Sequence, residues 1–433
     1  MRTLAEWLTL QESVHPKTID MDLTRVAPVA RALGITAPAF PVITVGGTNG
    51  KGSVAAHLEA LLRARGASTG MFTSPHFVRY NERIRVDGVE VDDAQLIEAF
   101  ERIEAARGAI TLSFFEYNTL AALLVFAARA VDVAVLEVGL GGRLDATNLV
   151  AADVAVLASV GFDHRDWLGD TLELIGAEKA GIFRAGRPAV LGTPDMPASV
   201  YDAIRTVGAQ GYVAERDFSW RMNGKRWDYL GLNRSLRDLP SSALAGSIQY
   251  RNAATALASL EALEVAGGTG RPAVRTLTGR LKPLDVACVS SALPAVRLAG
   301  RFQVVPGEVE WILDIAHNEP AARVLAAQLR ERGARGTTYA VIGVLADKDA
   351  AAIAAALADV IDRWVLCALP GPRGCSAEEL AQRLKRPAAA VTLAPDVASG
   401  CAQARSMSRP GDRVVVCGSV HTVGPALEWL RIY

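Results

Sequence analysis

The stretch VITVGGTNGKGS, residues 42–53, decides the fold class of this chain of 433 residues. A β-branched apolar run ends in a glycine-rich turn carrying Lys51, and a helical pattern follows over residues 54–65. A strand, a glycine loop and a helix in this order place backbone N–H groups and a helix N-terminus where they can bind phosphates. In the common form of the motif the lysine directly precedes Ser or Thr, with a glycine six residues upstream. Here Gly52 follows the lysine and Val45 takes the upstream place, so the loop is a variant; the alternative is an ordinary glycine-rich turn.

Composition limits the classes of function that the chain can have. Lysine and arginine total 46, aspartate and glutamate total 46, and half of the residues are hydrophobic. This balance favours an α/β enzyme with a sizeable core and gives no sign of a nucleic-acid or membrane surface. The longest apolar run, residues 120–136, is interrupted by Arg129 and Asp132 and indicates a helix and a buried strand.

The N-terminal sequence and the cysteines bear on the cellular compartment. Residues 1–7 lack the apolar core and cleavage site of a secretory signal. The cysteines are five, an odd number without metal-type spacing, at Cys288, Cys367, Cys375, Cys401 and Cys417. We therefore expect reduced structural thiols in a cytoplasmic protein. The neutral net charge and the lack of an obvious exposed apolar helix make a monomer the default expectation.

Apolar runs alternate with helical patterns along the chain and predict two α/β domains, residues 1–295 and 296–433. In the first, runs without polar alternation suit a parallel sheet covered on both faces; they lie at 42–45, 131–138, 154–160 and 189–191. Residues 212–229 differ, because aromatic and charged residues alternate around Asn223-Gly224, which predicts a small antiparallel excursion.

A short connection around residues 290–300 separates the second, smaller domain, which we expect to be Rossmann-like. Its expected strands are 311–315, 339–344, 364–368 and 413–417, with helices starting at Glu319, Ala350 and Ala377.

Polar residues at the ends of the apolar runs are the candidates for chemistry. Glu137 ends a buried strand, where a carboxylate can hold Mg²⁺ or can be a salt-bridged glutamate. His164 follows another strand and could be a metal ligand, a base or a loop histidine. Ser74 lies in a loop and offers one more oxygen to a hard cation. Lys179 lies on a helical stretch, where a solvated or ion-paired lysine is the ordinary interpretation.

Two polar clusters end strands of the second domain. Residues 314–318 and 418–422 each follow an apolar run and precede a helix. The carboxyl ends of parallel strands are where such sheets bind ligands, although both clusters could be helix caps alone.

Taken together, these motifs resemble the folylpolyglutamate synthase/dihydrofolate synthase family of the Mur-ligase superfamily, whose members are ATP-dependent amide-forming ligases. The matching segments run in family order over nearly the whole chain: 47–53, 73–76, 137–148, 163–164, 178–182, 300–303, 314–318, 347–349 and 418–423. One glycine loop would be a weak signal, whereas this ordered set is specific.

The resemblance implies roles for the matching positions. ATP would be held by Thr48, Asn49, Gly50, Lys51, Gly52, Ser53, Asn252, Arg301 and Asp314. One Mg²⁺ would be bound by Ser74 and Glu137 and a second by His164. Lys179 would carry a CO₂-derived carbamate, which overturns its ordinary interpretation, because an ammonium repels a metal whereas a carbamate supplies oxygen ligands. Lys51, Lys179 and His164 would be the catalytic residues.

The resemblance also implies the substrate sites. The pterin would contact three segments, Ser13-Val14-His15-Pro16, Ser113-Phe114-Phe115-Glu116 and Leu144-Asp145-Ala146. Aromatic and apolar walls with one or two carboxylates suit a flat ring that carries N–H donors. His317 and Ser419 are candidates for the incoming glutamate.

The reaction implied is ligation through an acyl phosphate, with dihydropteroate, reduced folates and L-glutamate as substrates in the bifunctional form. The alternatives are a monofunctional folylpolyglutamate synthase and another Mur-type amino acid ligase, which typically has a further domain before the glycine loop. A P-loop switch protein would leave Glu137, His164 and Lys179 without a purpose. A dinucleotide-binding oxidoreductase is disfavoured because no G-x-G-x-x-G follows the first strand.

Overall fold

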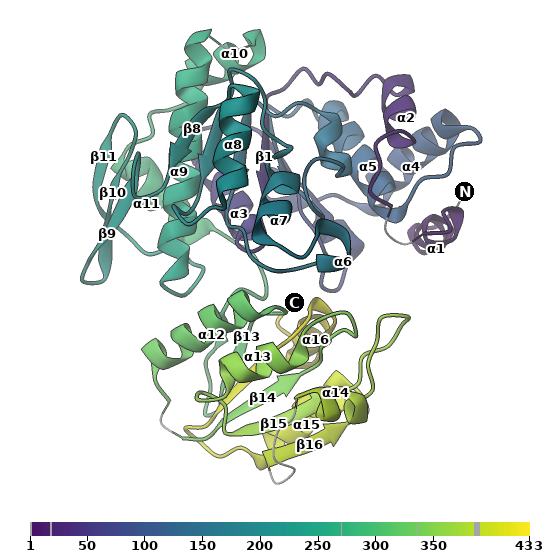
Figure 1. Cartoon of the computed structure of the whole chain (residues 1–433), viewed down its shortest axis with the longest axis vertical. Coiled ribbons are helices and arrows are strands. Elements are labelled where there is room, and N and C mark those ends of the chain that lie inside the picture. Colours follow the sequence, from purple (N-terminus) through teal and green to yellow (C-terminus); the bar gives the residue numbers. More distant parts are fainter. Residues whose placement is uncertain (1, 18–19, 270, 335, 385–389) are drawn as a thin grey trace. The chain divides into compact units, whose positions relative to one another are not determined.

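The structure, a computed structural model, describes residues 2–17, 20–269, 271–334, 336–384 and 390–433 (Figure 1). The chain forms two compact units. Unit 1 comprises Met1–His76, Tyr80–Ala243 and Tyr250–Val296, and unit 2 comprises Phe77–Arg79, Leu244–Gln249 and Arg297–Tyr433. The division of functions between residues 1–295 and 296–433 stays a prediction.

Unit 1 is built on an eight-stranded sheet in the order β4-β3-β2-β5-β1-β6-β7-β8. The strands from β2 to β8 in that order are parallel, and β3 and β4 form an antiparallel edge. Every residue of β1, β5 and β6 is buried, as both faces of a covered sheet require. The strands are β1 Val42–Gly46, β2 Thr69–Phe72, β3 Ile84–Val86, β4 Val89–Glu90, β5 Val133–Glu137, β6 Val154–Leu157, β7 Pro188–Leu191 and β8 Gln210–Val213.

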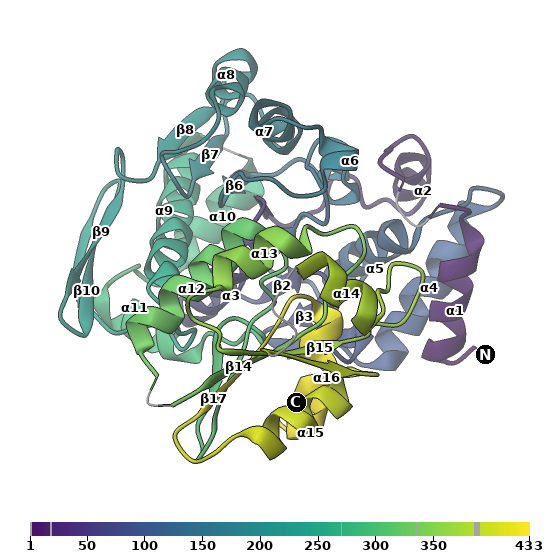
Figure 2. The same cartoon turned by 60° about the horizontal axis from the view of Figure 1, so that its bottom comes forward.

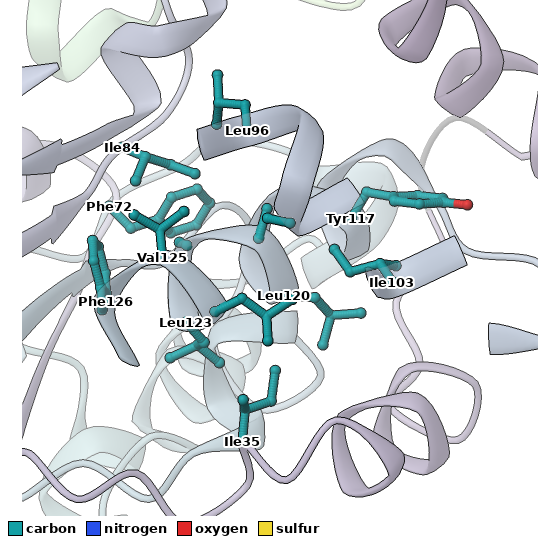
Figure 3. Packing of buried hydrophobic residues seen from close by; sticks show 14 of the residues in the cluster. Ile35, Phe72, Ile84, Leu96, Ile103, Tyr117, Leu120, Leu123, Val125 and Phe126 are labelled. Carbon is teal, nitrogen blue, oxygen red and sulfur yellow. The ribbon is translucent and has the colours of Figure 1, made fainter. Parts of the chain in front are cut away.

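Helices cover the sheet and supply its core. Within one hydrophobic cluster of unit 1, Phe72 from β2 and Phe126 from α5 pack with Leu120 and Leu123 (Figure 3). Gly70 allows this packing, because a Cβ there would lie 2.5 Å from the Phe126 ring. The helices are α1 Leu4–Val14, α2 Val26–Ala32, α3 Lys51–Ala64, α4 Asp93–Arg107, α5 Phe114–Ala128, α6 Arg165–Leu168, α7 Leu172–Ala180, α8 Ala198–Val207, α9 Ile248–Thr269, α10 Pro272–Arg280 and α11 Val286–Ala292, with 3₁₀ helices η1 Tyr80–Arg83, η2 Ala146–Leu149 and η3 Leu293–Ala295.

A small antiparallel sheet, β11-β10-β9, follows the parallel one. Its strands are β9 Ser219–Asn223, β10 Arg226–Leu230 and β11 Ser235–Leu239. The turn between β9 and β10 contains Gly224 at a φ of 63°, as Asn-Gly turns require. The expected excursion began too early, because Tyr212 lies in β8 and pairs with Val190 in the parallel sheet.

Unit 2 is a six-stranded sheet in the order β12-β13-β17-β14-β15-β16, parallel except for β12. Helices α12, α13 and α14 cover one face and α15 and α16 the other (Figure 2). The strands are β12 Gln303–Val305, β13 Glu310–Leu313, β14 Thr338–Ile342, β15 Arg363–Cys367, β16 Val391–Ala394 and β17 Arg413–Cys417; the helices are α12 Glu319–Arg332, α13 Ala350–Leu357, α14 Ala377–Leu384, α15 Val397–Met407 and α16 Val420–Leu430.

The expected fold class, two α/β units of which the first has a P-loop sheet and a small antiparallel excursion, is confirmed. Two short strands of unit 2, β12 and β16, escaped prediction because most of their residues are only partly buried. No helix in the described part of the chain has the length and hydropathy that crossing a membrane requires. All five cysteines are free thiols, and four of them are buried.

A buried histidine in α3 gives the first prediction, which concerns acid stability. His57 is fully buried; its Nδ1 lies 2.7 Å from the Ser53 carbonyl oxygen and its Nε2 2.9 Å from Ser242 Oγ. Burial lowers the pKa of His57 to about 4. In the unfolded chain the histidine takes up a proton near pH 6.5, whereas in the folded chain it stays neutral down to about pH 4. The free energy of unfolding should therefore fall as pH drops from 6.5 to 4, by about 3 kcal/mol at pH 4.

The measurement is the thermal unfolding midpoint of the wild type and of His57→Gln between pH 7.5 and 4.5. The wild-type midpoint should fall more steeply than that of the variant, which lacks this proton. Parallel curves would show that His57 is not the group responsible.

Candidate functional site

The glycine loop between β1 and α3 is held against two other parts of unit 1. Gly47 has a φ of 140°, and a Cβ there would lie 3.1 Å from the Ser159 backbone nitrogen. The Thr48 N–H donates to the Ser159 carbonyl at 2.8 Å. At Gly50, with a φ of 89°, a Cβ would lie 3.2 Å from Asn252 Oδ1 in α9. The structure thus brings the predicted Asn252 to the loop, and glycine is required at both positions.

Side chains tie the loop to the segment after β6. Thr48 Oγ1 donates to the Gly161 carbonyl and accepts from the Gly161 N–H, both at 3.0 Å. Ser159 Oγ accepts from the Asn49 N–H at 3.1 Å and donates to the Asn49 carbonyl at 2.9 Å. Lys51, Gly52 and Ser53 then form the first turn of α3. The loop is therefore preorganised by bonds between two neighbouring parallel strands.

Two lysines meet at one carbonyl of this loop. Lys51 Nζ donates to the carbonyl oxygens of Gly47 at 2.9 Å and Thr48 at 3.2 Å. Lys179 Nζ, from α7, donates to the same Gly47 oxygen at 3.2 Å. Lys179 is only 5% exposed and lies at the glycine loop, so it is not a solvated lysine; its modification stays a prediction.

The environment of Lys179 favours its neutral amine. Burial and, second, the nearby positive charge of Lys51 lower the pKa of Lys179 to about 7, while Asp163 and Asp145 act in the opposite direction. A large fraction of the side chain is then unprotonated near neutral pH, unlike an ordinary lysine.

Close backbone contact positions Lys179. A Cβ on Gly142 would lie 2.7 Å from the Lys179 carbonyl oxygen, so only glycine fits there. The Arg143 N–H donates to the Glu178 carbonyl at 2.9 Å, and the two side chains form an ion pair at 2.7 Å. The segment after β5 and the C-terminal turn of α7 therefore interlock.

Glu137 and His164 stand where metal ligands were expected. Glu137, the last residue of β5, is 4% exposed, and its Oε2 accepts from the Ser74 N–H at 3.1 Å. His164 caps α6 with a left-handed backbone, and its Nε2 lies 3.9 Å from Asp163 Oδ2. In register, Val45 pairs with Glu137, so β1 and β5 end at the same edge of the sheet.

The predicted metal ligands at this edge of the sheet can be tested for the types of donor atom that they offer. Among the described residues, no three His, Cys, Asp or Glu side chains converge tightly enough to hold a metal ion. The predicted set also relies on the hydroxyl of Ser74 and the modified amine of Lys179. Carboxylate, hydroxyl and carbamate oxygens are hard donors of the kind that Mg²⁺ prefers, so the residues fit that ion once Lys179 is modified.

A second group of predicted residues surrounds the start of α5. Ser113 and Glu116 form a capping box, with the Ser113 N–H donating to Glu116 Oε2 at 2.6 Å. Arg25 pairs with Glu116 Oε1 at 3.1 Å and with Asp20 Oδ2 at 3.0 Å. Asp20 Oδ2 also lies 3.1 Å from His15 Nε2. The network links three predicted pterin residues through Asp20 and Arg25, which sequence reasoning missed.

Apolar groups extend this wall. A Cβ on Gly139 would lie 2.5 Å from the Phe115 ring, which packs against Phe72 with centroids 5.7 Å apart. The Met21 Cε would lie 2.9 Å from a Cβ on Gly141. Met21 was not among the predicted residues, because nothing in the local pattern of residues 20–25 distinguishes a binding segment from a connection.

The other predicted pterin residues have structural contacts. Ser13 and Val14 end α1, where Ser13 Oγ donates to the Leu10 carbonyl at 2.8 Å, and Pro16 lies two residues beyond the helix. Asp145, between Leu144 and Ala146, accepts from the Leu140 N–H at 2.9 Å and the Thr147 hydroxyl at 2.6 Å. Burial raises its pKa, and these bonds oppose the shift. Asp145 thus orders its own loop.

In unit 2, Asp314 organises the end of β13. Its carboxylate accepts from the N–H groups of Phe302 and Ala316, both at 2.8 Å. Burial raises the pKa of Asp314, and the positive charge of Arg301 acts against the rise. The predicted pair Arg301 and Asp314 therefore interacts electrostatically.

The predicted glutamate residues lie at the same edge of the unit 2 sheet, because Leu313 in β13 pairs with Val416 in β17. His317 Nδ1 lies 2.9 Å from the Ile315 carbonyl oxygen. Ser419 caps α16 and accepts from the His421 N–H at 3.1 Å. Both contacts are structural, and a role in ligand binding stays a prediction.

Comparisons with known proteins cover nearly the whole chain. Residues 45–200 match the Mur ligase middle domain, and residues 300–420 match the Mur ligase glutamate ligase domain. The chain is 42% identical over 429 residues to the dihydrofolate synthase/folylpolyglutamate synthase of Escherichia coli K12, covering 98% of this chain and 95% of that protein.

Solved structures of proteins from the same family also match this chain over its whole length. That of E. coli FolC in complex with DHPP and ADP is 40% identical, with a TM-score of 0.91, and the match covers 100% of this chain and 98% of that one. A bifunctional folylpolyglutamate synthase/dihydrofolate synthase with Mn, AMPPNP and L-glutamate bound is 42% identical, with a TM-score of 0.88 and coverage of 100% and 98%.

Proposed function

This chain belongs to the dihydrofolate synthase/folylpolyglutamate synthase family of Mur ligases, and from that premise we propose that it joins L-glutamate to dihydropteroate and to reduced folates using ATP. The family resemblance drawn from the ordered motifs is confirmed by these comparisons. The observation that carries the proposed chemistry is the meeting of Lys51 and Lys179 at the Gly47 carbonyl of a phosphate-type loop.

The loop residues would bind ATP. The N–H groups at the start of α3 and the positive charge of Lys51 suit the β- and γ-phosphates, with Thr48 and Ser159 holding the loop in shape. The complexes of related proteins with ADP and AMPPNP support this assignment. Asn252, which lies at the loop, would also contribute to the nucleotide site. The assignment of Arg301 and Asp314 to ATP stays a prediction.

Divalent metal would be held by Ser74 and Glu137 at one position and His164 at a second. Manganese in a related structure supports a divalent ion, and two Mg²⁺ ions are our proposal for this chain. Bound metal would neutralise the repulsion between the substrate carboxylate and the triphosphate.

Lys179 would become a metal ligand by carbamylation. Its neutral amine attacks CO₂, a C–N bond forms, and one proton leaves, which gives a carbamate with two oxygen donors. A pKa of about 7 supports the step, because only the unprotonated amine is nucleophilic. The positive charge of Lys51 would then face an anion instead of a second cation.

The ligation proceeds in two steps. The acceptor carboxylate attacks the γ-phosphorus of ATP, and ADP leaves with the electrons of the broken P–O bond. The glutamate amine then attacks the acyl carbon of the acyl phosphate, phosphate leaves, and the nitrogen loses a proton to give the amide. Holding the amine against the acyl phosphate can lower the activation barrier by about 7–11 kcal/mol when the reacting groups are well aligned.

The acceptor would bind where His15, Ser113, Phe115 and Glu116 meet, since this wall combines flat apolar groups with a buried carboxylate. His317 and Ser419 are proposed for glutamate. A monomer, a cytoplasmic location and the absence of nucleic-acid or membrane partners stay predictions.

The deciding experiment measures phosphate release from ATP and Mg²⁺ with L-glutamate and either dihydropteroate or tetrahydrofolate, with products checked by mass. We expect release with both acceptors, each gaining one glutamyl unit. A response to tetrahydrofolate alone would make the enzyme a monofunctional folylpolyglutamate synthase. Release that does not depend on glutamate would overturn the ligase assignment.

A further inference from the structure

A buried arginine lies beside the proposed metal edge of unit 1. Arg83 ends η1, and its carbonyl accepts from the Thr73 N–H at 2.9 Å. Thr73 directly follows β2 and precedes Ser74, whose N–H donates to Glu137. The backbone of Arg83 is therefore fixed next to the loop that contacts a proposed metal ligand.

The guanidinium of Arg83 contacts a histidine and two aromatic rings. The residue is 7% exposed, and its Nε donates to His76 Nδ1 at 2.7 Å, which leaves the ring of His76 neutral with its proton on Nε2. The guanidinium carbon lies 5.3 Å from the centroid of the Phe114 ring and 5.8 Å from that of Tyr80. Stacking of this kind orients a cation but does not neutralise it.

Arg83 differs from the other deeply buried arginines in its lack of a carboxylate. Arg65, 3% exposed, pairs with Glu264 at 2.6 Å, and Arg413, 5% exposed, pairs with Glu310 at 3.1 Å. Among the described residues, no Asp or Glu oxygen lies within ion-pair distance of Arg83. Burial lowers the pKa of Arg83, and the nearby Tyr80, Glu82 and Glu137 act in the opposite direction.

An uncompensated buried charge is costly, and an arginine cannot escape the cost by losing its proton. Such a group is explained when a ligand brings the opposite charge. The planar fork of a guanidinium matches a carboxylate or a phosphate in two parallel hydrogen bonds. The groups around Arg83 favour a carboxylate. Its neighbour Phe114 belongs to the segment proposed to bind the acceptor, between Ser113 and Phe115, and not to the glycine loop proposed to bind phosphates.

We infer that Arg83 binds a carboxylate of the acceptor substrate and positions it at the edge formed by Ser74 and Glu137. The inference rests on the proposed function, since it names the substrate of that same site. Arg83 would be a binding residue that discriminates acids from neutral analogues, with His76, Tyr80 and Phe114 holding its side chain in place.

The test is equilibrium binding of two ligands, dihydropteroate and its analogue in which a carboxamide replaces the carboxylate. The wild type should prefer the acid by about 10- to 100-fold, as expected for hydrogen bonds to a charged group. In Arg83→Gln this preference should vanish, while the affinity for AMPPNP stays within about threefold of wild type. Arg83→Lys should keep part of the preference, because it retains charge but loses the fork.

A matched control is Arg280→Gln, because Arg280 forms an ion pair with Asp132, which directly precedes the opposite end of β5. This variant should keep the wild-type preference for the acid. The thermal midpoint of Arg83→Gln should not fall, since the change removes an uncompensated charge, whereas a purely structural role predicts a marked fall.

Equal weakening of both ligands in Arg83→Gln, or an unchanged preference, would overturn the inference. A loss of AMPPNP affinity with the preference intact would also overturn it and would assign Arg83 to the nucleotide. If the wild type neither binds nor ligates dihydropteroate, the proposed function fails and the inference fails with it. Ligation without a loss of discrimination in the variant rejects the inference alone.

Discussion

Lys179→Ala is expected to lower the turnover of glutamate ligation by a thousandfold or more, on the order of the loss when preorganised electrostatic groups are removed from an active site. The substitution removes a deeply buried amine at the Gly47 carbonyl whose pKa is about 7. Without it no carbamate can form, and the site would lack the two carbamate oxygens and their shared negative charge proposed to lie beside Lys51. The measurement is phosphate release at saturating ATP, glutamate and dihydropteroate.

Bicarbonate and pH separate this explanation from a folding defect. In the wild type, depletion of CO₂ should lower activity and bicarbonate should restore it; in Lys179→Ala bicarbonate should restore nothing. The fraction of neutral amine falls as pH drops below 7, so the bicarbonate requirement should grow in acid. Near-normal turnover of the variant would remove the carbamate from the mechanism.

Lys179→Met is the matched variant for stability. The folded pKa of Lys179 is depressed from 10.5 to about 7, so between these values the unfolded chain binds a proton that the folded chain does not. Unmodified wild-type protein is therefore destabilised most below pH 7 and gains stability as pH rises to 10.5. The methionine variant lacks this dependence and should unfold at a higher temperature than CO₂-depleted wild type at pH 6.5.

Lys51→Ala should lower kcat/KM for ATP by about 10²- to 10³-fold, because the variant lacks the charge that we propose for binding the phosphates. In the structure Lys51 Nζ bridges the carbonyls of Gly47 and Thr48, so the loop also loses two hydrogen bonds. The measurement is kcat/KM for ATP together with the affinity for AMPPNP. Unchanged nucleotide affinity and rate would exclude Lys51 from the phosphate site.

A second effect of this variant tests the coupling of the two lysines. The charge of Lys51 helps to lower the pKa of Lys179, so its removal should raise that pKa and reduce the neutral amine. The residual activity of Lys51→Ala should therefore respond more strongly to added bicarbonate and to higher pH than wild-type activity does. Identical responses would show that the lysines act independently.

The glycine loop and the carboxylate that ends β5 were predictable because each depends on a short, continuous segment. An apolar strand followed by glycines and a helix is recognisable without knowledge of the rest of the chain. Glu137 was likewise marked by its place at the end of an apolar run. The contact of Lys179 with the loop was not predicted: the family resemblance implied a carbamate on this lysine, and a lysine on a helix usually faces solvent.

The acceptor wall was only partly predictable, because its charged network joins distant segments. Arg25 and Glu116 are 91 positions apart, and the pairing depends on how the residue before α2 is placed against the start of α5. Nothing in the sequence marks Arg83 as buried, because charged residues such as Glu82 and Arg85 lie on either side of it. Its burial is visible only in the folded structure. Side-chain partners across such separations are decided by tertiary packing.

The assignment of residues 77–79 to unit 2 has a consequence for how this protein can be cut and recombined. A Cβ on Gly424 would lie 2.4 Å from the Phe77 carbonyl oxygen, and one on Gly300 would lie 2.7 Å from the Phe77 ring. Unit 2 therefore takes a structural piece from a stretch more than 200 positions upstream of its main segment. A fragment that starts at Arg297 would expose the surface shaped for Phe77, and exchange of C-terminal halves between relatives would mismatch it. Chimeras should stay soluble only when residues 77–79 come from the same parent as the C-terminal segment. The two halves of the chain therefore cannot be exchanged independently, in evolution or in engineering.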